Sequence, residues 1–494
     1  MTGPEWHREM MSRLNRVESR LRQEGDSSGD LRVERADLLA LLDRMDEARA
    51  LYWQVLTEHP AHPAALINLG VLLVRTGYHQ AGERCFEEAV NRHPRLSAGY
   101  VNWAHILRER GEWQRARQLY DQALALEPDS VQAHQGLAVL LQDMGDAAGA
   151  ATHREKAFRS RPVMRLPYRG DNSAVSVLII SAAAGGNIPL ESWLDNRRFD
   201  MWVACAETAE PQDFPSCRVV FNAIGDADQA MEALGRADTI LQRIAVPVIN
   251  RPSRVAQTGR LAVSEGLSRI SGLHVPRIHI ITRDELKAPN IAERLEALGL
   301  SFPILFRTPG FHGGRYLVRV DHPSDVTRAV ARIPGPHVFA IQYIDTRSRD
   351  GYFRKYRLVF IGGRWFPVHM AVSDHWKVHY FTSLTPRRAE FQQEEQRFLT
   401  RPDTILGQDE YSVLNAVAEW FQLDFFGVDL ALTADGPVIF EANPTMVLNP
   451  PGAQDTWAEY RKPALNRAYQ AMQELVTRAA NSSGYRMPTK GGNH

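Results

Sequence analysis

The stretch that decides the fold of the C-terminal half reads Phe426-Gly-Val-Asp-Leu430 and, after a short turn, Gly436-Pro-Val-Ile-Phe-Glu-Ala-Asn-Pro444. The Ala-Asp-Gly sequence at the turn lies between two apolar runs, which predicts two antiparallel strands. Alternate side chains of a strand share a face, so Glu441 and Asn443 point the same way and Asp429 can lie beside them. Two carboxylates and an amide are hard oxygen donors, suited to a Mg²⁺ ion that also holds nucleotide phosphates. A surface hairpin with ordinary acidic residues is the alternative.

The overall composition indicates a soluble globular protein with several domains. A chain of 494 residues is too long for one core, and 44% hydrophobic and 23% charged residues are typical of globular proteins. Lys plus Arg and Asp plus Glu both number 58, so no basic field indicates a nucleic-acid partner. Cys85, Cys205 and Cys217 have no metal-binding spacing, which predicts reduced, buried thiols. The charged N-terminus is unlike a secretory signal, and no stretch approaches the ~20 apolar residues of a membrane helix, so we expect a cytoplasmic protein with no membrane partner.

An internal repeat fills the first third of the chain. Prolines fall at positions 60, 94, 128 and 162, each 34 residues after the last, and glycines mark turns at 77, 111 and 145. Small and aromatic residues recur in phase, at Ala48, Gly82, Ala116 and Ala150 and at Tyr52, Phe86 and Tyr120, with Arg154 in the last aromatic position. A 34-residue helix–turn–helix unit of this kind is the tetratricopeptide repeat (TPR) pattern.

We therefore expect four TPR units over residues 29–164, preceded by a capping helix within residues 1–28. Small residues let paired helices approach closely, and each aromatic side chain fills the space between them. Such a solenoid typically holds a peptide or protein partner in its groove. A scaffold for dimerisation, and hence a homodimer, is the alternative.

The next segment predicts a small α/β domain over residues 175–255. A continuous apolar strand at Val175–Ile180 is followed by shorter strand patterns at Met201–Cys205, Val219–Asn222 and Val246–Ile249, separated by helical stretches. The pair Gly185-Gly186 after the first strand is interpreted as a tight turn or as a place where backbone approaches a ligand.

A basic residue and a glycine-rich loop follow. A helix is expected over Arg254–Ser271, and a strand at Phe302–Arg307 leads into a loop that contains Gly310, Gly313 and Gly314. Glycines let backbone N–H groups approach an anion that the cation neutralises, so this loop is a candidate phosphate cradle. A flexible hairpin loop is the alternative.

Two further strands carry polar residues. The run Val338–Asp345 ends in polar residues, and Phe353–Trp365 is typical of a hairpin. Lys355 and Arg357 lie two apart in this hairpin and share a face. Inward-facing cations are costly unless anions are present, whereas a solvated outer face is the alternative.

The order of these pieces resembles the ATP-grasp superfamily, and within it the RimK-type and glutathione-synthetase-like carboxylate–amine ligases. The resemblance covers about residues 175–478. It implies ATP and Mg²⁺ as cofactors, with Asp429, Glu441 and Asn443 as metal ligands and Arg357 on the acyl phosphate. It also implies that Gln342, Tyr343 and Ile344 contact the adenine and that Asp345 lies near the ribose. The loop that covers the phosphates would contain Gly310, His312, Gly313 and Gly314.

Two departures from the family pattern concern charge. Arg260 and Arg307 stand where the family commonly has phosphate-contacting lysines, and an arginine fork is not a lysine point charge. Lys355 stands where the family has an acidic residue, so a metal-side carboxylate is missing or is replaced by a substrate-binding cation. Lys355, Arg307 and Arg357 are the candidate catalytic residues.

The segment after the hairpin supplies candidates for the acceptor pocket. They are His369, Ser373, Trp376, Lys377 and His379. His375 and His379 are four apart, as in helical zinc sites, but Trp376, Val378 and Tyr380 alternate as in a strand and the resemblance implies magnesium. A purely structural cluster is the alternative.

Together these features predict a multidomain fold: an all-α TPR solenoid, an α/β pre-ATP-grasp domain, an α+β ATP-grasp domain over 256–478 and a disordered tail over 479–494. The expected function is ATP-dependent carboxylate–amine ligation through an acyl phosphate. The expected substrates are a peptide or protein held by the solenoid and a small amine or carboxylate. A non-catalytic nucleotide-binding switch and a kinase on the same scaffold are the alternatives.

Overall fold

The computed structural model describes residues 3–42, 44–158, 162–170, 174–183, 185–309, 316–379, 382–446, 448 and 456–482. The chain forms two compact units. One comprises Met1–Val177 and Asp195–Ser216, and the other comprises Leu178–Leu194 and Cys217–His494. In the part of the chain that the structure describes, no helix combines the length and apolarity needed to cross a membrane.

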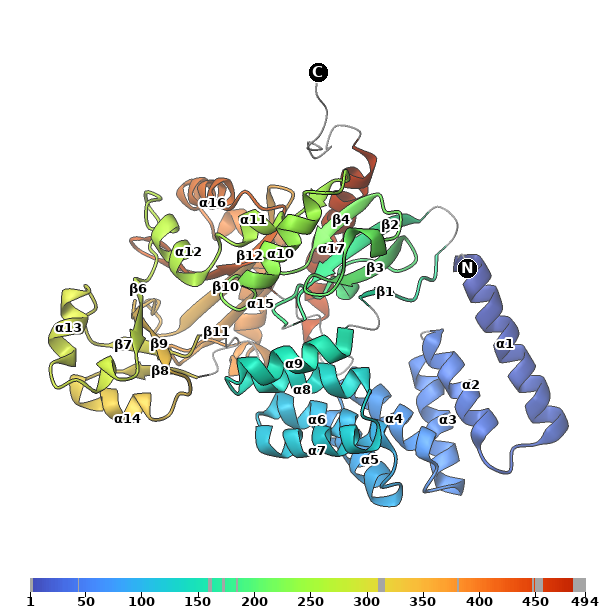
Figure 1. Ribbon diagram of the computed structural model, residues 1–494. Helices are drawn as coiled ribbons and strands as arrows, with labels where there is room; N and C mark the ends of the chain where they lie inside the picture. The colour runs from blue at the N-terminus through green and yellow to red at the C-terminus, as the bar shows by residue number, and fades with distance from the viewer. Residues whose placement is uncertain are drawn as a thin grey trace. The chain divides into compact units, whose positions relative to one another are not determined.

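The first unit begins with α1 (Gly3–Glu24) and continues as an array of helix pairs (Figure 1). The pairs are α2 (Asp30–Leu41) with α3 (Met45–Glu58), α4 (Pro63–Arg75) with α5 (His79–Arg92), α6 (Ser97–Arg110) with α7 (Trp113–Leu126), and α8 (Val131–Asp143) with α9 (Ala147–Phe158). The second helices begin at residues 45, 79, 113 and 147, in step with the prolines. The repeating helix–turn–helix prediction is thus confirmed.

The predicted small and aromatic positions form the contacts between these helices. Ala48, Ala116 and Ala150 are fully buried. A Cβ added at Gly136 of α8 would lie 2.4 Å from the ring of Tyr120 on α7. The Tyr120 ring therefore occupies space that Gly136 leaves open, and the Phe86 ring does the same at Gly70, as packing of ridges into grooves requires.

The turn glycines have the conformation that their position demands. Gly77, Gly111 and Gly145 have φ values of 89°, 82° and 88°. This left-handed region favours glycine because other L-residues clash there. In the last pair Arg154 hydrogen-bonds to the side-chain oxygen of Gln142 instead of placing an aromatic ring between helices.

The first unit also contains β1 (Val163–Arg165), which pairs antiparallel with β3 (Phe199–Cys205). In the second unit, β4 (Val219–Asn222) pairs in parallel with β5 (Val248–Ile249). Its neighbour β2 (Val175–Ser181) belongs to this unit from Leu178 onward. The helix that follows β4 is α10 (Met231–Leu241). The expected strand at Val246–Ile249 is shorter than predicted, because only its last two residues pair.

A break divides the helix that was expected over Arg254–Ser271. The chain forms α11 (Pro252–Val255), leaves the helix through Gly259, and resumes as α12 (Arg260–Leu267). Both oxygens of Asp228 accept the backbone N–H of Arg260 at 3.1 Å. This cap starts the second helix at Arg260 and so determines where that side chain lies.

The second unit also contains two four-stranded sheets within the described residues. The first has the order β6-β9-β7-β8 and the second the order β11-β10-β12-β13. Their strands are β6 (Ile278–Thr282), β7 (Ile304–Arg307), β8 (Leu317–Val320), β9 (His337–Gln342), β10 (Phe353–Ile361), β11 (Arg364–Ser373), β12 (Phe425–Thr433) and β13 (Gly436–Asn443). Both predicted hairpins, β10–β11 and β12–β13, are confirmed.

Helices accompany each sheet. They are α13 (Ile291–Ala297) and α14 (Val326–Val330) beside the first sheet, and α15 (Ala389–Thr400), α16 (Gln408–Phe421) and α17 (Lys462–Asn481) in the part that holds the second. Both α15 and α17 contact β11. The disordered tail was predicted from residue 479, but α17 continues to Asn481. Residues 483–494 lie outside the described residues.

Asn250 fastens the segment before α11 to the start of β12. Its side chain donates to the carbonyl of Phe425 at 2.7 Å and accepts the N–H of Phe425 at 2.8 Å, and its own backbone N–H donates to Asp424 at 2.9 Å. Asn250 is fully buried and has a φ of 54°, which asparagine tolerates better than most residues. These bonds hold the strand that carries Asp429.

Candidate functional site

A cavity of about 510 Å³ lies between the two four-stranded sheets of the second unit. One part of its wall is apolar and is formed by Pro276, Ile278, Leu305, Leu317, Ile341 and Phe440. The other part carries charged side chains, namely Arg260, Arg307, Lys355, Arg357, Lys377, Asp429 and Glu441. Among the described residues, five cationic side chains and two carboxylates therefore line one cavity.

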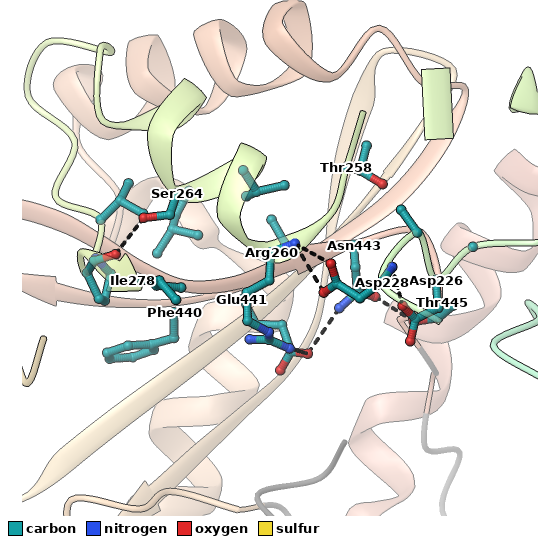
Figure 2. A pocket seen from close by; sticks show the side chains of 17 residues that line it. Asp226, Asp228, Thr258, Arg260, Ser264, Ile278, Phe440, Glu441, Asn443 and Thr445 are labelled. Carbon is teal, nitrogen blue, oxygen red and sulfur yellow. Dashed lines mark hydrogen bonds and ion pairs between the residues drawn. The ribbon is translucent and has the colours of Figure 1, made fainter. Parts of the chain in front are cut away.

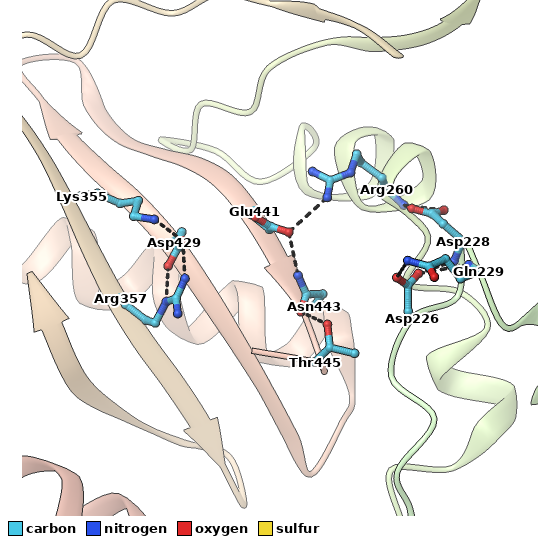
Figure 3. Close-up of polar contacts among 10 residues, drawn as sticks. All are labelled: Asp226, Asp228, Gln229, Arg260, Lys355, Arg357, Asp429, Glu441, Asn443 and Thr445. Atoms are coloured by element: carbon cyan, nitrogen blue, oxygen red, sulfur yellow. Dashed lines mark hydrogen bonds and ion pairs between the residues drawn. The ribbon is translucent and has the colours of Figure 1, made fainter. Parts of the chain in front are cut away.

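Asp429 lies on β12 opposite two cations on β10. Arg357 is its register partner, and Arg357 donates from Nε to Oδ1 at 2.7 Å and from Nη2 to Oδ2 at 2.8 Å. Lys355 Nζ donates to Oδ2 at 2.9 Å (Figure 3). The Asp429 side chain is only 4% exposed. Burial opposes its negative charge, but Arg357 and Lys355 outweigh burial and hold the pKa of Asp429 well below its usual range.

Glu441 and Asn443 extend this polar face on β13. Glu441 is the register partner of Asp429, so the two carboxylates project from the same side of the sheet. Glu441 Oε1 accepts from Arg260 Nη2 and from Asn443 Nδ2, each at 3.1 Å, and Asn443 Oδ1 accepts from the Thr445 hydroxyl at 2.8 Å (Figure 3). The predicted alignment of the three oxygen-bearing side chains is present.

A smaller recess of about 40 Å³ adjoins the cavity and shares Arg260, Glu441, Asn443 and Thr445 with it (Figure 2). Asp226 and Asp228 line only this recess. Asp228 caps α12, while Asp226 accepts backbone N–H groups of Asp228 and Gln229 at 2.9 and 3.2 Å. These two carboxylates place Arg260 at the edge of the cavity.

Arg307 and Lys377 bring further positive charge into the cavity wall. Burial, and next the neighbouring Arg260, lower the pKa of Arg307 to about 10. Burial, and next Arg307, lower the pKa of Lys377 as well. Both shifts result from placing cations together in a poorly solvated space, which favours an anionic ligand there.

Part of the segment expected to contact the adenine and ribose lines the cavity. Gln342, Tyr343 and Ile344 line it, followed by Thr346. The ring of Tyr343 packs edge-on against Trp376 with centroids 6.3 Å apart. Asp345 is absent from the described lining; its side chain is about half exposed and accepts the backbone N–H of Arg347 at 3.1 Å.

Three of the five acceptor-pocket candidates line the cavity, namely Trp376, Lys377 and His379. His369 and Ser373 are buried in β11 and are absent from the described lining. Burial, and then the cations Arg357 and Lys355, hold the pKa of His369 well below its usual value, so it is a neutral residue beneath the site. The strand expected through Trp376–Tyr380 does not form in the described part, because β11 ends at Ser373 and residues 374–377 are bends.

The candidate phosphate loop follows β7 in the chain. Gly310, His312, Gly313 and Gly314 lie outside the described residues. The strand that precedes the loop is β7, and its last residue, Arg307, lines the cavity as the sequence pattern predicts.

Several residues that line the cavity were not predicted as site residues from the sequence. They include Asn187, Thr346, Phe353, Thr445 and Met446. The Gly185-Gly186 pair was a signal for this wall, since Gly186 lines the cavity and a Cβ there would lie 2.7 Å from the Cβ of Asp226. The apolar residues gave no signal because ordinary strand residues face a core and a cavity alike.

The available donors suit a hard cation bound together with an anionic ligand better than a soft metal. Across the described ranges no group of three or more His, Cys, Asp and Glu side chains has the arrangement of a metal site. The oxygens of Asp429, Glu441 and Asn443 nevertheless share one face, and oxygen donors of this kind suit Mg²⁺, which usually keeps waters and substrate phosphates as its other ligands.

Comparisons with known proteins identify the N-terminal part. A family model described as TPR repeat matches residues 104–145. Together with the 34-residue helix period, this match identifies a TPR repeat region in the N-terminal part, followed by a mixed α/β region with three sheets. No curated protein matches the chain.

Solved structures resemble this chain over the same helical region. A tetratricopeptide repeat protein from Parabacteroides merdae is 22% identical over 30% of this chain and 58% of its own, with a TM-score of 0.27. A thermophilic TPR protein from Thermus thermophilus is 22% identical over 31% of this chain and 84% of its own, with a TM-score of 0.28. MamA from Desulfovibrio magneticus is 20% identical over 33% of this chain and 98% of its own, with a TM-score of 0.27.

Proposed function

We propose that the second unit is an ATP-dependent carboxylate–amine ligase of the ATP-grasp type. The observation that carries the proposal is the convergence of Arg260, Arg307, Lys355, Arg357, Asp429, Glu441 and Asn443, from five separate segments, on one cavity between two sheets. In the sequence these residues belong to an ordered series of motifs that resembles this superfamily.

The cavity suits a nucleoside triphosphate at both ends. Its apolar wall, with Ile278, Leu305 and Ile341, matches a flat aromatic base, while its charged wall matches a polyphosphate. Lysine and arginine exceed aspartate and glutamate by three among the described lining residues. A triphosphate offsets this excess, which would otherwise be costly in a partly buried space.

The oxygen donors available to Mg²⁺ are the carboxylates of Asp429 and Glu441 and the amide of Asn443. When bound, the ion neutralises charge on the terminal phosphates. The side chains of Arg260, Arg307 and Lys377 neutralise the remainder and orient the phosphoryl group that is transferred.

The proposed reaction has two steps. A carboxylate oxygen of one substrate attacks the terminal phosphorus, the bond from that phosphorus to ADP breaks, and an acyl phosphate forms. An amine then attacks the acyl carbon, phosphate leaves, and the nitrogen loses a proton to give the amide. Arg357 steadies the acyl-phosphate oxygens, and exclusion of water from the cavity keeps the acyl phosphate from hydrolysis.

The TPR region supports a peptide or protein as one of the substrates. Arrays of helix pairs commonly bind extended peptides, and the resemblance includes enzymes that act on peptides or proteins. The test of this part is hydrogen–deuterium exchange across α2–α9 with and without a peptide that serves as substrate. Protection of those helices supports it, and unchanged exchange contradicts it.

Turnover and product mass test the ligase itself. We would supply ATP, Mg²⁺, a panel of peptides and single amino acids, and measure ADP release together with the mass of each product. Ligation joins two substrates with loss of water, whereas a kinase leaves a stable phosphorylated product and a nucleotide-gated switch gives no sustained ADP release.

A pair of variants links turnover to the cavity. Glu441→Gln should lower turnover by roughly 10³-fold, since a carboxylate at the metal supplies several kcal/mol of charge stabilisation. Glu459→Gln, at an exposed carboxylate outside the described lining, is the matched control and should retain turnover. Full activity of Glu441→Gln would contradict the proposed site.

A further inference from the structure

We propose that Asp429 serves as the counter-ion of Lys355 and Arg357 and that the site takes a single divalent cation, at Glu441 and Asn443, with the Lys355 ammonium in place of a second metal. This inference rests on the proposed function, because it concerns how the same cavity holds Mg²⁺ and nucleotide. It divides the three oxygen-bearing side chains into two groups with different roles.

The first observation is the occupancy of the Asp429 carboxylate. A carboxylate offers about four lone-pair positions. Three are used here, by Arg357 Nε on Oδ1 and by Arg357 Nη2 and Lys355 Nζ on Oδ2, at 2.7, 2.8 and 2.9 Å. The two-pronged arginine contact is the strong, directional kind. Asp429 therefore already has the coordination of an anion that orients two cations.

The second observation is the surroundings of those cations. The Lys355 and Arg357 side chains are each only 14% exposed, so water solvates a small part of either cation. A divalent ion bound to Asp429 would lie beside both positive charges. A phosphate group beside the two cations would instead accept hydrogen bonds from both, and its repulsion by Asp429 is offset because two cations face one carboxylate.

Glu441 and Asn443 differ from Asp429 in this respect. Arg260 and the neutral amide of Asn443 donate hydrogen bonds of 3.1 Å to Glu441, longer than the bonds of 2.7, 2.8 and 2.9 Å on Asp429. The Glu441 side chain is 22% exposed, compared with 4% for Asp429. A cation at Glu441 and Asn443 would therefore compete with longer hydrogen bonds than one at Asp429, on a carboxylate that is more accessible.

Counting bound Mn²⁺ tests the proposal without turnover. The wild-type chain is titrated with Mn²⁺ in the presence of a non-hydrolysable ATP analogue, and free Mn²⁺ is measured by electron paramagnetic resonance. We expect one bound Mn²⁺ per chain. Two bound ions would overturn this inference and leave the proposed function intact, whereas no binding of the analogue would overturn the proposed function and this inference with it.

Two variants separate the roles of the carboxylates. Asp429→Asn should weaken analogue binding about tenfold and still bind one Mn²⁺ with a midpoint within about twofold of wild type, because the cations lose their orientation and the metal keeps its ligands. Glu441→Gln should raise the Mn²⁺ midpoint by about tenfold or more, the cost of losing even a supporting group at a metal site.

A third variant keeps the test valid if the buried Asp429 is needed for folding. Lys355→Met removes the ammonium from the edge of the same cluster and leaves the arginine fork on Asp429. Analogue affinity should fall about tenfold while the Glu441-dependent Mn²⁺ midpoint stays in place. Loss of Mn²⁺ binding in Asp429→Asn with unchanged analogue affinity, or unchanged analogue affinity in Lys355→Met, contradicts the proposal.

Discussion

Replacing Glu395 by glutamine tests a buried ion pair next to β11, a strand of the sheet that carries the candidate site. Glu395 on α15 accepts from Arg461 Nη2 at 2.7 Å, from the Tyr460 hydroxyl at 2.5 Å and from the backbone N–H of Met370 at 3.0 Å. Met370 lies on β11, and its register partner on β10 is Tyr356. Tyr356 stands between Lys355 and Arg357, the two cations that contact Asp429. Through its bond with Met370, Glu395 thus fastens α15 to β11, the strand beside the one that carries Lys355 and Arg357.

The expected cost follows from burial. The side chains of Glu395 and Arg461 are 0% and 2% exposed. Glutamine keeps the shape of glutamate but leaves the Arg461 guanidinium in the interior without its compensating charge. Breaking such a pair costs about 3–5 kcal/mol, which is a large share of the roughly 5–15 kcal/mol that stabilises a typical folded protein.

The assay is equilibrium unfolding in denaturant at neutral pH, followed by tryptophan fluorescence and fitted with separate transitions for the two units. The matched control is Glu459→Gln, which removes a carboxylate 2.6 Å from Lys462. Those two side chains are 56% and 54% exposed, so the control should stay within about 0.5 kcal/mol of wild type.

A loss below about 1 kcal/mol for Glu395→Gln, or a loss equal to that of the control, would refute the reasoning, because the pair would then be effectively solvated. The double variant Glu395→Leu, Arg461→Met should recover part of the loss, since no charge remains buried. Recovery should be incomplete, because the N–H of Met370 and the hydroxyl of Tyr460 lose their acceptor.

Two further predictions concern other parts of the chain. Gly136→Ala should lower the stability of the TPR region by about 1–3 kcal/mol, because the new Cβ would lie 2.4 Å from the fully buried Tyr120 ring. Its control is Gly235→Ala in α10, where no atom lies within 4 Å of the new Cβ, and this variant should be about 0.5–1 kcal/mol more stable than wild type. Equal shifts in melting temperature for the two variants would contradict the packing argument. Because the folded pKa of Asp429 is depressed, its contribution to stability is present above the ordinary aspartate pKa and is lost as pH falls through the folded value. The stability difference between wild type and Asp429→Asn should therefore shrink as the pH is lowered below about 4, and a difference that grows on acidification would oppose the assignment.

Local patterns in the sequence determined the helix array and the hairpins. The 34-residue period, the small and aromatic positions and the turn glycines act within one or two neighbouring helices, so their physics is readable from adjacent residues. The same holds for the β12–β13 hairpin, where the alternation of Glu441 and Asn443 around Ala442 predicts a shared face. The cysteines show the limit of such reasoning, since Cys205 is buried as expected but Cys85 and Cys217 are only partly so.

Only the tertiary structure decided which charges meet. Arg260 reaches Glu441 across 181 positions, and Lys355 reaches Asp429 across 74. Glu395 and Arg461, 66 apart, form a buried pair that no sequence pattern indicated. His369, Ser373 and Asp345, all singled out from the sequence, lie outside the described lining of the cavity. The physical reason is that helix periods and turns depend on neighbouring residues, whereas burial and electrostatic pairing depend on how distant strands pack in space.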